Sequence, residues 1–309
     1  MSNSLIDLAY ASGWAAVRHV PEPVALSFFR SFADRATERD GRGVQRLRSN
    51  YARIQPDLDA DGLQELTRDG MRRYFRYWCE VFRLPSTSPQ TVLERVHPDG
   101  VDMLLESVDS GRGVVLALPH MGNWDLAGAW FTQAHGDRFE GRLMSVAERL
   151  QPESLFDRFV AYRESIGLEI LPLSGGSTPV FGALSQRLRS GGVVALVADR
   201  DLSKSGVEVD FFGDTARMPP GPAALAVATG AHLHPVGLWY DDRGLGGRIH
   251  EPLRPRIAAD SGDADVTADL VQQTADAFAM DIAQHTADWH MLQRIWIGDS
   301  ATETAEATG

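Results

Sequence analysis

A histidine and an aspartate follow the same apolar run of the chain and are spaced closely enough to act together. His120 comes two residues after the apolar run 114–118, and Asp125 comes five residues later. The run lies between a glycine turn and a proline, which predicts a short buried strand. Ligands in α/β folds bind at the carboxyl ends of such strands, where His120 is expected. A histidine and a carboxylate without an adjacent serine or cysteine predict general-base activation of a substrate hydroxyl.

The residues after His120 predict how this pair is positioned. Asn123 is a suitable N-cap for a helix that begins directly after it. Asp125 then lies in the first helical turn, where it either complements the helix dipole or reaches back to orient His120. The backbone N–H groups around Gly122 and the helix start are expected to face a developing oxyanion.

Other sequence signatures of catalysis are absent. The chain contains no G-x-S-x-G nucleophile elbow, no G-x-x-x-x-G-K-[ST] phosphate loop and no H-E-x-x-H zinc motif. The glycine-rich stretch 244–247 lacks the spacing and the preceding strand of a dinucleotide fingerprint. The single cysteine, Cys79, lies on an apolar helical face, which predicts core packing. His232 and His234 share one strand face without a third ligand nearby, so no metal centre is predicted.

The composition excludes several broad classes of protein. The 309 residues include 30 Lys+Arg and 42 Asp+Glu, a formal net charge of −12, and 43% of them are hydrophobic. This acidity argues against a duplex nucleic-acid binder, and one cysteine excludes a disulfide framework. The N-terminus lacks a basic secretory n-region, and no apolar run reaches the ~18 residues of a spanning helix. A soluble, cytoplasmic enzyme is expected.

Short apolar runs alternate with helical stretches from residue 100 onward, which is typical of an α/β fold with a mixed, largely parallel central sheet flanked by helices. The expected strands are 114–118, 143–146, 168–173, 193–198, 207–212 and 232–240. The expected helices lie near 100–109, 124–134, 153–166, 178–190 and 220–229. A final helix is expected to be capped by Thr267 and to bury Val271, Phe278 and Ile282.

The first 84 residues differ from the rest in charge. They hold 13 Arg against 11 Asp+Glu, whereas the remainder holds 17 basic and 31 acidic residues. Apolar residues recur there at helical spacing in three stripes, at 25–36, 44–54 and 71–82. Such basic amphipathic helices either pack on the body or lie on an anionic membrane surface. We therefore expect a membrane-associating helical segment of the same fold at 1–84, an α/β core at 85–298 and a flexible tail at 299–309.

The sequence from about residue 5 to residue 296 resembles the glycerolipid acyltransferase superfamily. His120 and Asp125 fit its H-x4-D motif, and further blocks follow in the superfamily's order. These blocks are Leu155-Phe-Asp-Arg158 with Arg163 and Gly167, Ala198-Asp199-Arg-Asp201, Phe211-Phe-Gly213, Pro219-x-Gly221-Pro-Ala223, Thr229-Gly-Ala231 with Pro235, and Trp289 to Arg294. The chain is most similar to the branch of bacterial lipid A lauroyl and myristoyl acyltransferases. Within that branch it resembles the actinobacterial phosphatidylinositol mannoside acyltransferases.

This resemblance implies the transfer of a palmitoyl chain from palmitoyl-CoA to the 6-position hydroxyl of a mannose in a phosphatidylinositol mannoside. His120 is then the general base, and the hydroxyl oxygen attacks the thioester directly, without an acyl-enzyme. The carboxylate partner of His120 is either Asp125, the motif residue, or Asp199, which follows the strand 193–198 and can reach the same sheet edge. The acyl-CoA is a co-substrate, and no further cofactor and no metal are implied.

Four further residues are candidate substrate ligands under this resemblance. Arg163 is expected to bind a CoA phosphate or the polar headgroup, and the alternative role is a surface salt bridge. Glu148 and Arg149 follow a strand end, where they either hydrogen-bond to sugar hydroxyls or are only solvated. Ser205, in a polar loop, is expected to contact the CoA moiety.

The resemblance also implies partners and a location. We expect acyl-CoA, a phosphatidylinositol mannoside acceptor and an anionic membrane surface as partners, no nucleic acid, and a monomer. The expected location is peripheral, on the cytoplasmic face of the plasma membrane. Two alternatives stay open: an acyltransferase acting on lipid A, another glycolipid or a lysophospholipid, and a non-catalytic lipid-binding protein. An esterase of the α/β-hydrolase type is disfavoured because the serine elbow is absent.

Overall fold

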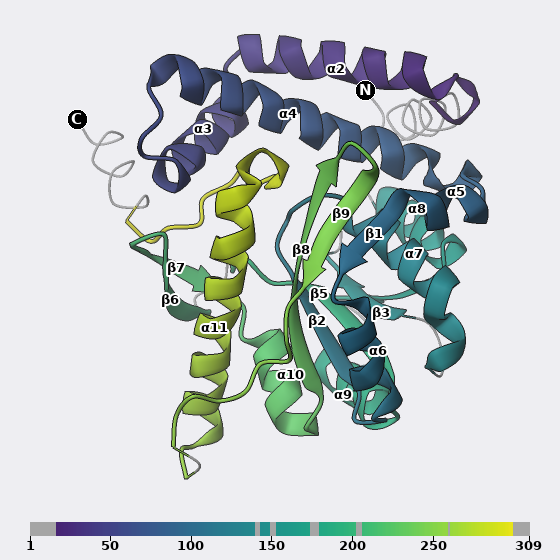
Figure 1. Cartoon of the computed structure of the whole chain (residues 1–309), viewed down its shortest axis with the longest axis vertical. Coiled ribbons are helices and arrows are strands. Elements are labelled where there is room, and N and C mark those ends of the chain that lie inside the picture. Colours follow the sequence, from purple (N-terminus) through teal and green to yellow (C-terminus); the bar gives the residue numbers. More distant parts are fainter. Residues whose placement is uncertain are drawn as a thin grey trace.

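A central sheet of seven strands carries His120 and Asp199 at one edge, with the strand order β1–β9–β8–β2–β5–β3–β4 (Figure 1). The strands are β1 (Val96–Asp99), β2 (Val114–Leu118), β3 (Leu143–Ala147), β4 (Leu168–Pro172), β5 (Val193–Val197), β8 (His232–Asp241) and β9 (Gly244–Ile249). Neighbouring strands are parallel except β8 and β9, which form an antiparallel hairpin. The computed structural model describes residues 17–139, 143–148, 153–173, 179–201, 206–258 and 260–298. The predicted α/β class, with a mixed and largely parallel sheet between helices, is confirmed.

Two separate apolar cores cover the two faces of the sheet, because successive side chains of a strand point to opposite sides. Leu116 and Leu118 of β2 join the core under α6, α7 and α8, whereas Val115 and Ala117 join the core under α9, α10 and α11. These helices are α6 (Val101–Asp109), α7 (Trp124–His135), α8 (Glu153–Ser165), α9 (Val180–Arg189), α10 (Gly221–Thr229) and α11 (Asp263–Gln284). Burial of β2 on both faces explains why its sequence is an unbroken apolar run.

Three helices precede the sheet in the chain and lie across the upper part of the view in Figure 1. They are α2 (Glu22–Glu38), α3 (Arg42–Ile54) and α4 (Ala60–Arg83), and the short α5 (Pro89–Arg95) follows them. Asp59 caps α4 by accepting a hydrogen bond from the Gly62 N–H at 2.8 Å. The apolar stripe predicted at 44–54 forms the buried face of α3, and α4 packs against both α2 and α3.

The apolar residues of α2 are divided between two sides of the helix. Ala25 and Ala33 are buried against the body. Val24, Phe28 and Phe32 are 57%, 58% and 43% exposed, and their spacing of four places them on one side of the helix. We call these three residues the α2 row. No helix in the described part of the chain is both long enough and apolar enough to cross a membrane.

Two details of the secondary structure differ from the sequence-based expectation. Thr267 lies inside α11 and donates its hydroxyl to the Asp263 carbonyl at 2.7 Å, so the predicted cap was wrong. The predicted inner face of α11 is confirmed, since its three apolar residues are buried. The glycine-rich stretch at 244–247 is part of strand β9, which the low strand propensity of glycine had concealed. A side chain at Gly247 would meet the Gly237 carbonyl oxygen at 2.7 Å, so the close approach of β8 and β9 requires glycine there.

Candidate active site

His120 and Asp199 meet across two neighbouring parallel strands. β2 ends at Leu118 and β5 ends at Val197, so both residues follow the carboxyl ends of paired strands. Asp199 Oδ1 lies 2.6 Å from His120 Nδ1, and Asp199 Oδ2 accepts a hydrogen bond from the His120 backbone N–H at 2.9 Å. One carboxylate therefore fixes both the ring and the backbone of His120. We call this pair the dyad.

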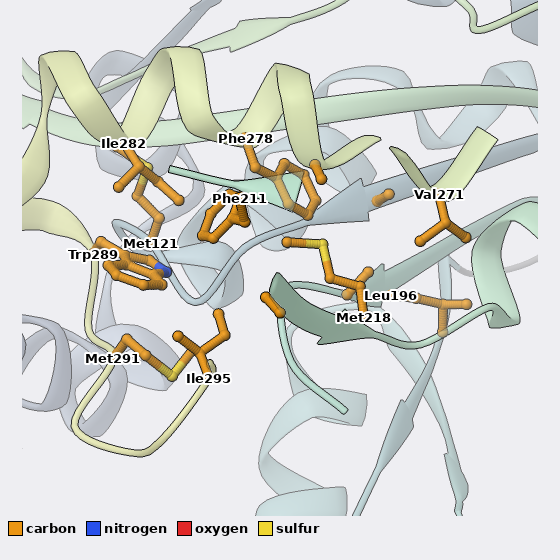
Figure 2. Close-up of a cluster of buried hydrophobic side chains, with 14 of the residues drawn as sticks. Met121, Leu196, Phe211, Met218, Val271, Phe278, Ile282, Trp289, Met291 and Ile295 are labelled. Atoms are coloured by element: carbon orange, nitrogen blue, oxygen red, sulfur yellow. The ribbon is translucent and has the colours of Figure 1, made fainter. Parts of the chain in front are cut away.

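A third contact reaches the dyad from the segment that follows α11. The indole N–H of Trp289 donates to Asp199 Oδ2 at 2.8 Å. Trp289 is fully buried in the apolar cluster of Figure 2, which also contains Met121. Met121 and Trp289 form an antiparallel bridge, and the His290 N–H donates to the His120 carbonyl at 2.7 Å. Both backbone and side-chain bonds of this segment therefore hold the loop that carries His120.

The surroundings of Asp199 determine which nitrogen of His120 is basic. Burial raises the pKa of Asp199, but the charge of His120 and the hydrogen bonds from His120 and Trp289 bring that pKa below its ordinary value. An ionised carboxylate only accepts hydrogen bonds, so it holds the His120 proton on Nδ1. The lone pair of neutral His120 is then on Nε2. Because the His120 side chain is 34% exposed, a substrate hydroxyl can approach it.

Asp125, the other carboxylate of the H-x4-D motif, has different partners. It lies in the first turn of α7, which Asn123 caps as predicted. Arg163 Nε donates to Asp125 Oδ1 at 2.8 Å, and the Tyr77 hydroxyl donates to Asp125 Oδ2 at 3.0 Å. Burial lowers the pKa of Arg163, but the charge of Asp125, the hydrogen bond to it and the nearby Tyr77 and Tyr162 together outweigh burial and raise that pKa above its ordinary value. Of the two carboxylates that the sequence left open, Asp199 is the one that contacts His120.

An apolar cavity lies between the sheet and α7, next to the dyad. Its lining comes from all seven strands of the central sheet and from α6, α7 and α8. Leu118 and Trp124 belong to this lining, and the Trp124 ring centroid is 5.8 Å from that of His120. The cavity has a volume of about 100 Å³. This apolar lining suits a hydrocarbon group.

Comparison with known proteins gives the family. The chain matches the family described as bacterial lipid A biosynthesis acyltransferase over residues 1–297. The chain belongs to this family. It is similar to the phosphatidylinositol mannoside acyltransferase of Mycolicibacterium smegmatis, with 46% identity over 309 residues, 100% of this chain and 97% of that protein. The protein of the same name from Mycobacterium tuberculosis H37Rv is 47% identical over 302 residues, 97% of this chain and 91% of that protein. The resemblance seen in the sequence is confirmed, and the chain is an acyltransferase.

Of the four predicted ligands of this acyltransferase, the structure describes Glu148 and Arg163. Glu148 is exposed and follows the end of β3. Arg149 and Ser205 lie outside the described residues. Arg163 is 18% exposed, and its Nε and Nη2 both donate to Asp125. Its predicted contact with a CoA phosphate or headgroup stays a prediction.

His290 lies beside the dyad and was not singled out from the sequence. It is 7% exposed, and its ring centroid lies 5.6 Å from that of Tyr74 and 5.9 Å from that of Tyr77. Neither ring nitrogen has a hydrogen-bond partner within the part of the acyltransferase that the structure describes. Burial lowers the pKa of His290 to about 3, and the charge of His120 acts in the same direction. His290 is therefore uncharged near neutral pH. The only sequence signal for this segment was the closing block that begins at Trp289.

Proposed function

We propose that this acyltransferase moves a palmitoyl chain from palmitoyl-CoA to the 6-position hydroxyl of a mannose in a phosphatidylinositol mannoside. The observation that carries the proposal is the dyad beside the apolar cavity. The cavity supports an acyl donor, because its lining is mostly apolar. The names of two relatives, 46% and 47% identical to this chain, support the acceptor. The CoA thioester, the chain length and the hydroxyl position rest on the family resemblance.

The geometry of the dyad supports a direct transfer. Nε2 of His120 removes the proton of the acceptor hydroxyl while that oxygen attacks the thioester carbonyl carbon. A new C–O bond forms, the C–S bond breaks, and the proton held by His120 passes to the departing thiolate, which leaves as CoA. Asp199 stabilises the imidazolium between these two proton transfers. The dyad contains neither serine nor cysteine, which supports a reaction without an acyl-enzyme.

The variant His120→Ala tests the proposed base. We expect acyl transfer from palmitoyl-CoA to a purified phosphatidylinositol mannoside to fall about 10²–10⁴-fold. The circular dichroism spectrum is expected to stay unchanged, because His120 is partly exposed. His232→Ala is the matched control, since His232 begins β8 at the opposite, amino edge of the parallel strands. Full transfer by His120→Ala would contradict the mechanism. A wild-type product with another glycolipid but none with the mannoside would contradict the acceptor.

The proposal includes a peripheral position on the anionic cytoplasmic face of the membrane. The α2 row supports it, because Val24, Phe28 and Phe32 present apolar surface on a helix that is otherwise rich in charge. Apolar side chains of this kind enter the headgroup boundary, and neighbouring arginines are attracted to anionic lipids. The donor and the acceptor are both amphiphiles, so both are concentrated at that surface.

Substitution of the α2 row tests the membrane position. We expect the triple variant with Val24→Ser, Phe28→Ser and Phe32→Ser to bind vesicles of phosphatidylglycerol and phosphatidylcholine at least about tenfold more weakly in sedimentation. Phe181→Ser on α9 is the control, because Phe181 is also exposed, at 48%, but lies on the body. Equal pelleting of the triple variant and the control would refute the assignment.

A further inference from the structure

A second cavity lies next to the segment that holds the dyad. It is an open pocket of about 480 Å³ between α2, α4 and the turn that joins β8 to β9. Its cationic lining is Arg30 from α2 and Arg72, Arg73 and Arg76 from α4. Arg72 and Arg73 both lie near Arg76 on α4, because spacings of four and three residues make side chains neighbours on a helix. We call this cavity the arginine pocket.

Protein contacts fix two of these arginines but occupy few of their donors. Arg73 Nη1 donates to Asp288 Oδ2 at 2.7 Å and to the Tyr240 carbonyl at 3.1 Å. Arg76 Nε donates to Glu80 at 2.8 Å, and its guanidinium stacks 3.8 Å above the Tyr240 ring. A guanidinium has five N–H donors, and these contacts engage one nitrogen of each arginine. The two side chains are 36% and 37% exposed, so the remaining donors can meet a ligand.

Carboxylates also line the pocket, where three aspartates lie beside the four arginines. Asp241 is held by its own neighbours, with its Oδ2 2.8 Å from His97 Nε2 and its Oδ1 bonded to two backbone N–H groups of the turn. Arg72 pairs with Asp34 at 2.7 Å and with Asp69 at 3.3 Å. Asp242 is exposed to solvent. Arg30 has no ion-pair partner in the described ranges. The lining therefore keeps an excess of one arginine over its aspartates, and the guanidinium N–H groups that no contact engages can donate to the anionic oxygens of a ligand.

Two consecutive residues, Asp288 and Trp289, connect the pocket to the dyad. Asp288, which binds Arg73, is 1% exposed, and its carbonyl accepts a hydrogen bond from the Gly122 N–H at 3.0 Å. The next residue is Trp289, which holds the carboxylate of the dyad. On the opposite wall, Arg30 belongs to the helix that carries the α2 row. The pocket thus lies between the helix proposed to meet the membrane and the proposed site of acyl transfer.

We infer that the arginine pocket binds the phosphodiester of the acceptor lipid and thereby places the acceptor's sugar at the dyad. The planar donor fork of arginine matches phosphate oxygens in pairs, and several such forks converge here. A lipid phosphate lies at the membrane surface, where Arg30 is expected to be. The inference rests on the proposed function for the identity of the acceptor.

Kinetics of two variants test the inference. We expect Arg30→Gln and Arg76→Lys each to raise the KM for a phosphatidylinositol mannoside about tenfold, because each loses contacts with a charged group. The KM for palmitoyl-CoA is expected to stay within about twofold of the wild-type value. Arg35→Gln is the control, since it removes one charge from the exposed surface of α2 outside the pocket. An acceptor KM no higher than that of Arg35→Gln, or a raised KM for palmitoyl-CoA instead, overturns the inference.

Calorimetric titration of the full chain separates this inference from the proposed function. Inositol phosphate is expected to bind the wild type and Arg35→Gln, and to bind Arg30→Gln about tenfold more weakly. Inositol itself, which lacks the phosphate, is expected to give no heat. Binding of inositol phosphate but not of inositol supports the assignment of the pocket even if the enzyme acylates no mannoside. Absence of acylation would contradict only the proposed function. Absence of inositol phosphate binding, or its displacement by CoA, overturns the assignment.

Discussion

Two charged pairs follow the same strand, and they differ in how much of each faces solvent. The dyad joins the ends of β2 and β5, with a histidine side chain 34% exposed and a carboxylate that has no exposed surface. Asp125 and Arg163 join α7 to α8, and their side chains are 1% and 18% exposed. The dyad therefore leaves a basic nitrogen open to a substrate, whereas the ion pair uses its charges within the protein.

This difference changes the interpretation of the H-x4-D spacing. The five-residue separation places Asp125 in the first turn of α7, where its carboxylate contacts Arg163 of α8 and Tyr77 of α4. The motif aspartate thus anchors the start of the helix that follows His120. The contact with His120 comes from Asp199, on a strand that is adjacent in the sheet and distant in the chain. Residues of one motif need not be partners in one pair.

Substitution of the two aspartates by asparagine is the strongest test of this division. Asp199→Asn is expected to lower kcat about 10³–10⁴-fold, because the amide neither stabilises the imidazolium nor keeps the proton on Nδ1 of His120. Asp125→Asn keeps the shape of the α7 anchor, and the folded variant is expected to retain kcat within about tenfold. Steady-state kinetics at saturation with both substrates measures the two values. A larger loss of kcat in Asp125→Asn would reverse the roles assigned to the two carboxylates.

The free energy of unfolding is expected to depend mainly on the ion pair of Asp125 and Arg163, whereas kcat depends mainly on the dyad. Arg163→Met leaves the carboxylate of Asp125 buried without its cation, which costs about 3–5 kcal/mol in the free energy of unfolding. Urea unfolding monitored by tryptophan fluorescence measures this loss. Arg138→Met is the control, because Arg138 and Asp109 form an exposed pair worth at most about 1 kcal/mol. The double variant Asp125→Leu with Arg163→Met is expected to regain most of the stability. Equal losses in Arg163→Met and the control would show that the buried pair does not anchor α7.

The sequence predicted the local parts of the site better than the long-range ones. The strand before His120 and the cap at Asn123 depend on neighbouring residues, so periodicity and side-chain chemistry revealed them. The contact of His120 with Asp199 depends on β5 pairing with β2, and a slip of one residue in a strand would turn its side chains to the other face. The bond from Trp289 depends on where the chain returns after α11. No local pattern carries that information.

Protonation of His290, beside the dyad, is expected to weaken the protein on acidification. Burial lowers the pKa of His290 to about 3, whereas the unfolded chain binds that proton near pH 6.5. Between these values the unfolded state holds more of this proton, so the contribution of His290 to the free energy of unfolding falls by about 2 kcal/mol from pH 7 to pH 5. Asp288 acts in the opposite direction, because burial raises its pKa to about 6. The depressed pKa of Asp199 removes stability only near pH 4 and below.

The variant His290→Leu isolates this contribution. Its side chain cannot be protonated, and no hydrogen bond to a described residue is lost with the ring. Urea unfolding at pH 7 and pH 5 is expected to show a pH effect about 2 kcal/mol smaller than in the wild type. An unchanged pH effect would place the acid-sensitive groups elsewhere, and the dyad's surroundings would then be no more sensitive to acid than those of the ion pair.

The smallest expected effect concerns the indole that supports the dyad. Trp289→Phe removes one of the hydrogen bonds to Asp199 and is expected to lower kcat about tenfold, with little change in either KM. Trp296→Phe is a closely matched control, because Trp296 is buried in the same cluster and its indole donates to the Phe211 carbonyl at 2.9 Å. The two variants are expected to lose similar stability, since each gives up one indole hydrogen bond and similar packing. Only Trp289→Phe is expected to slow acyl transfer. Equal kcat in the two variants would mean that the indole contributes packing alone, and that Asp199 holds His120 without help from the C-terminal segment.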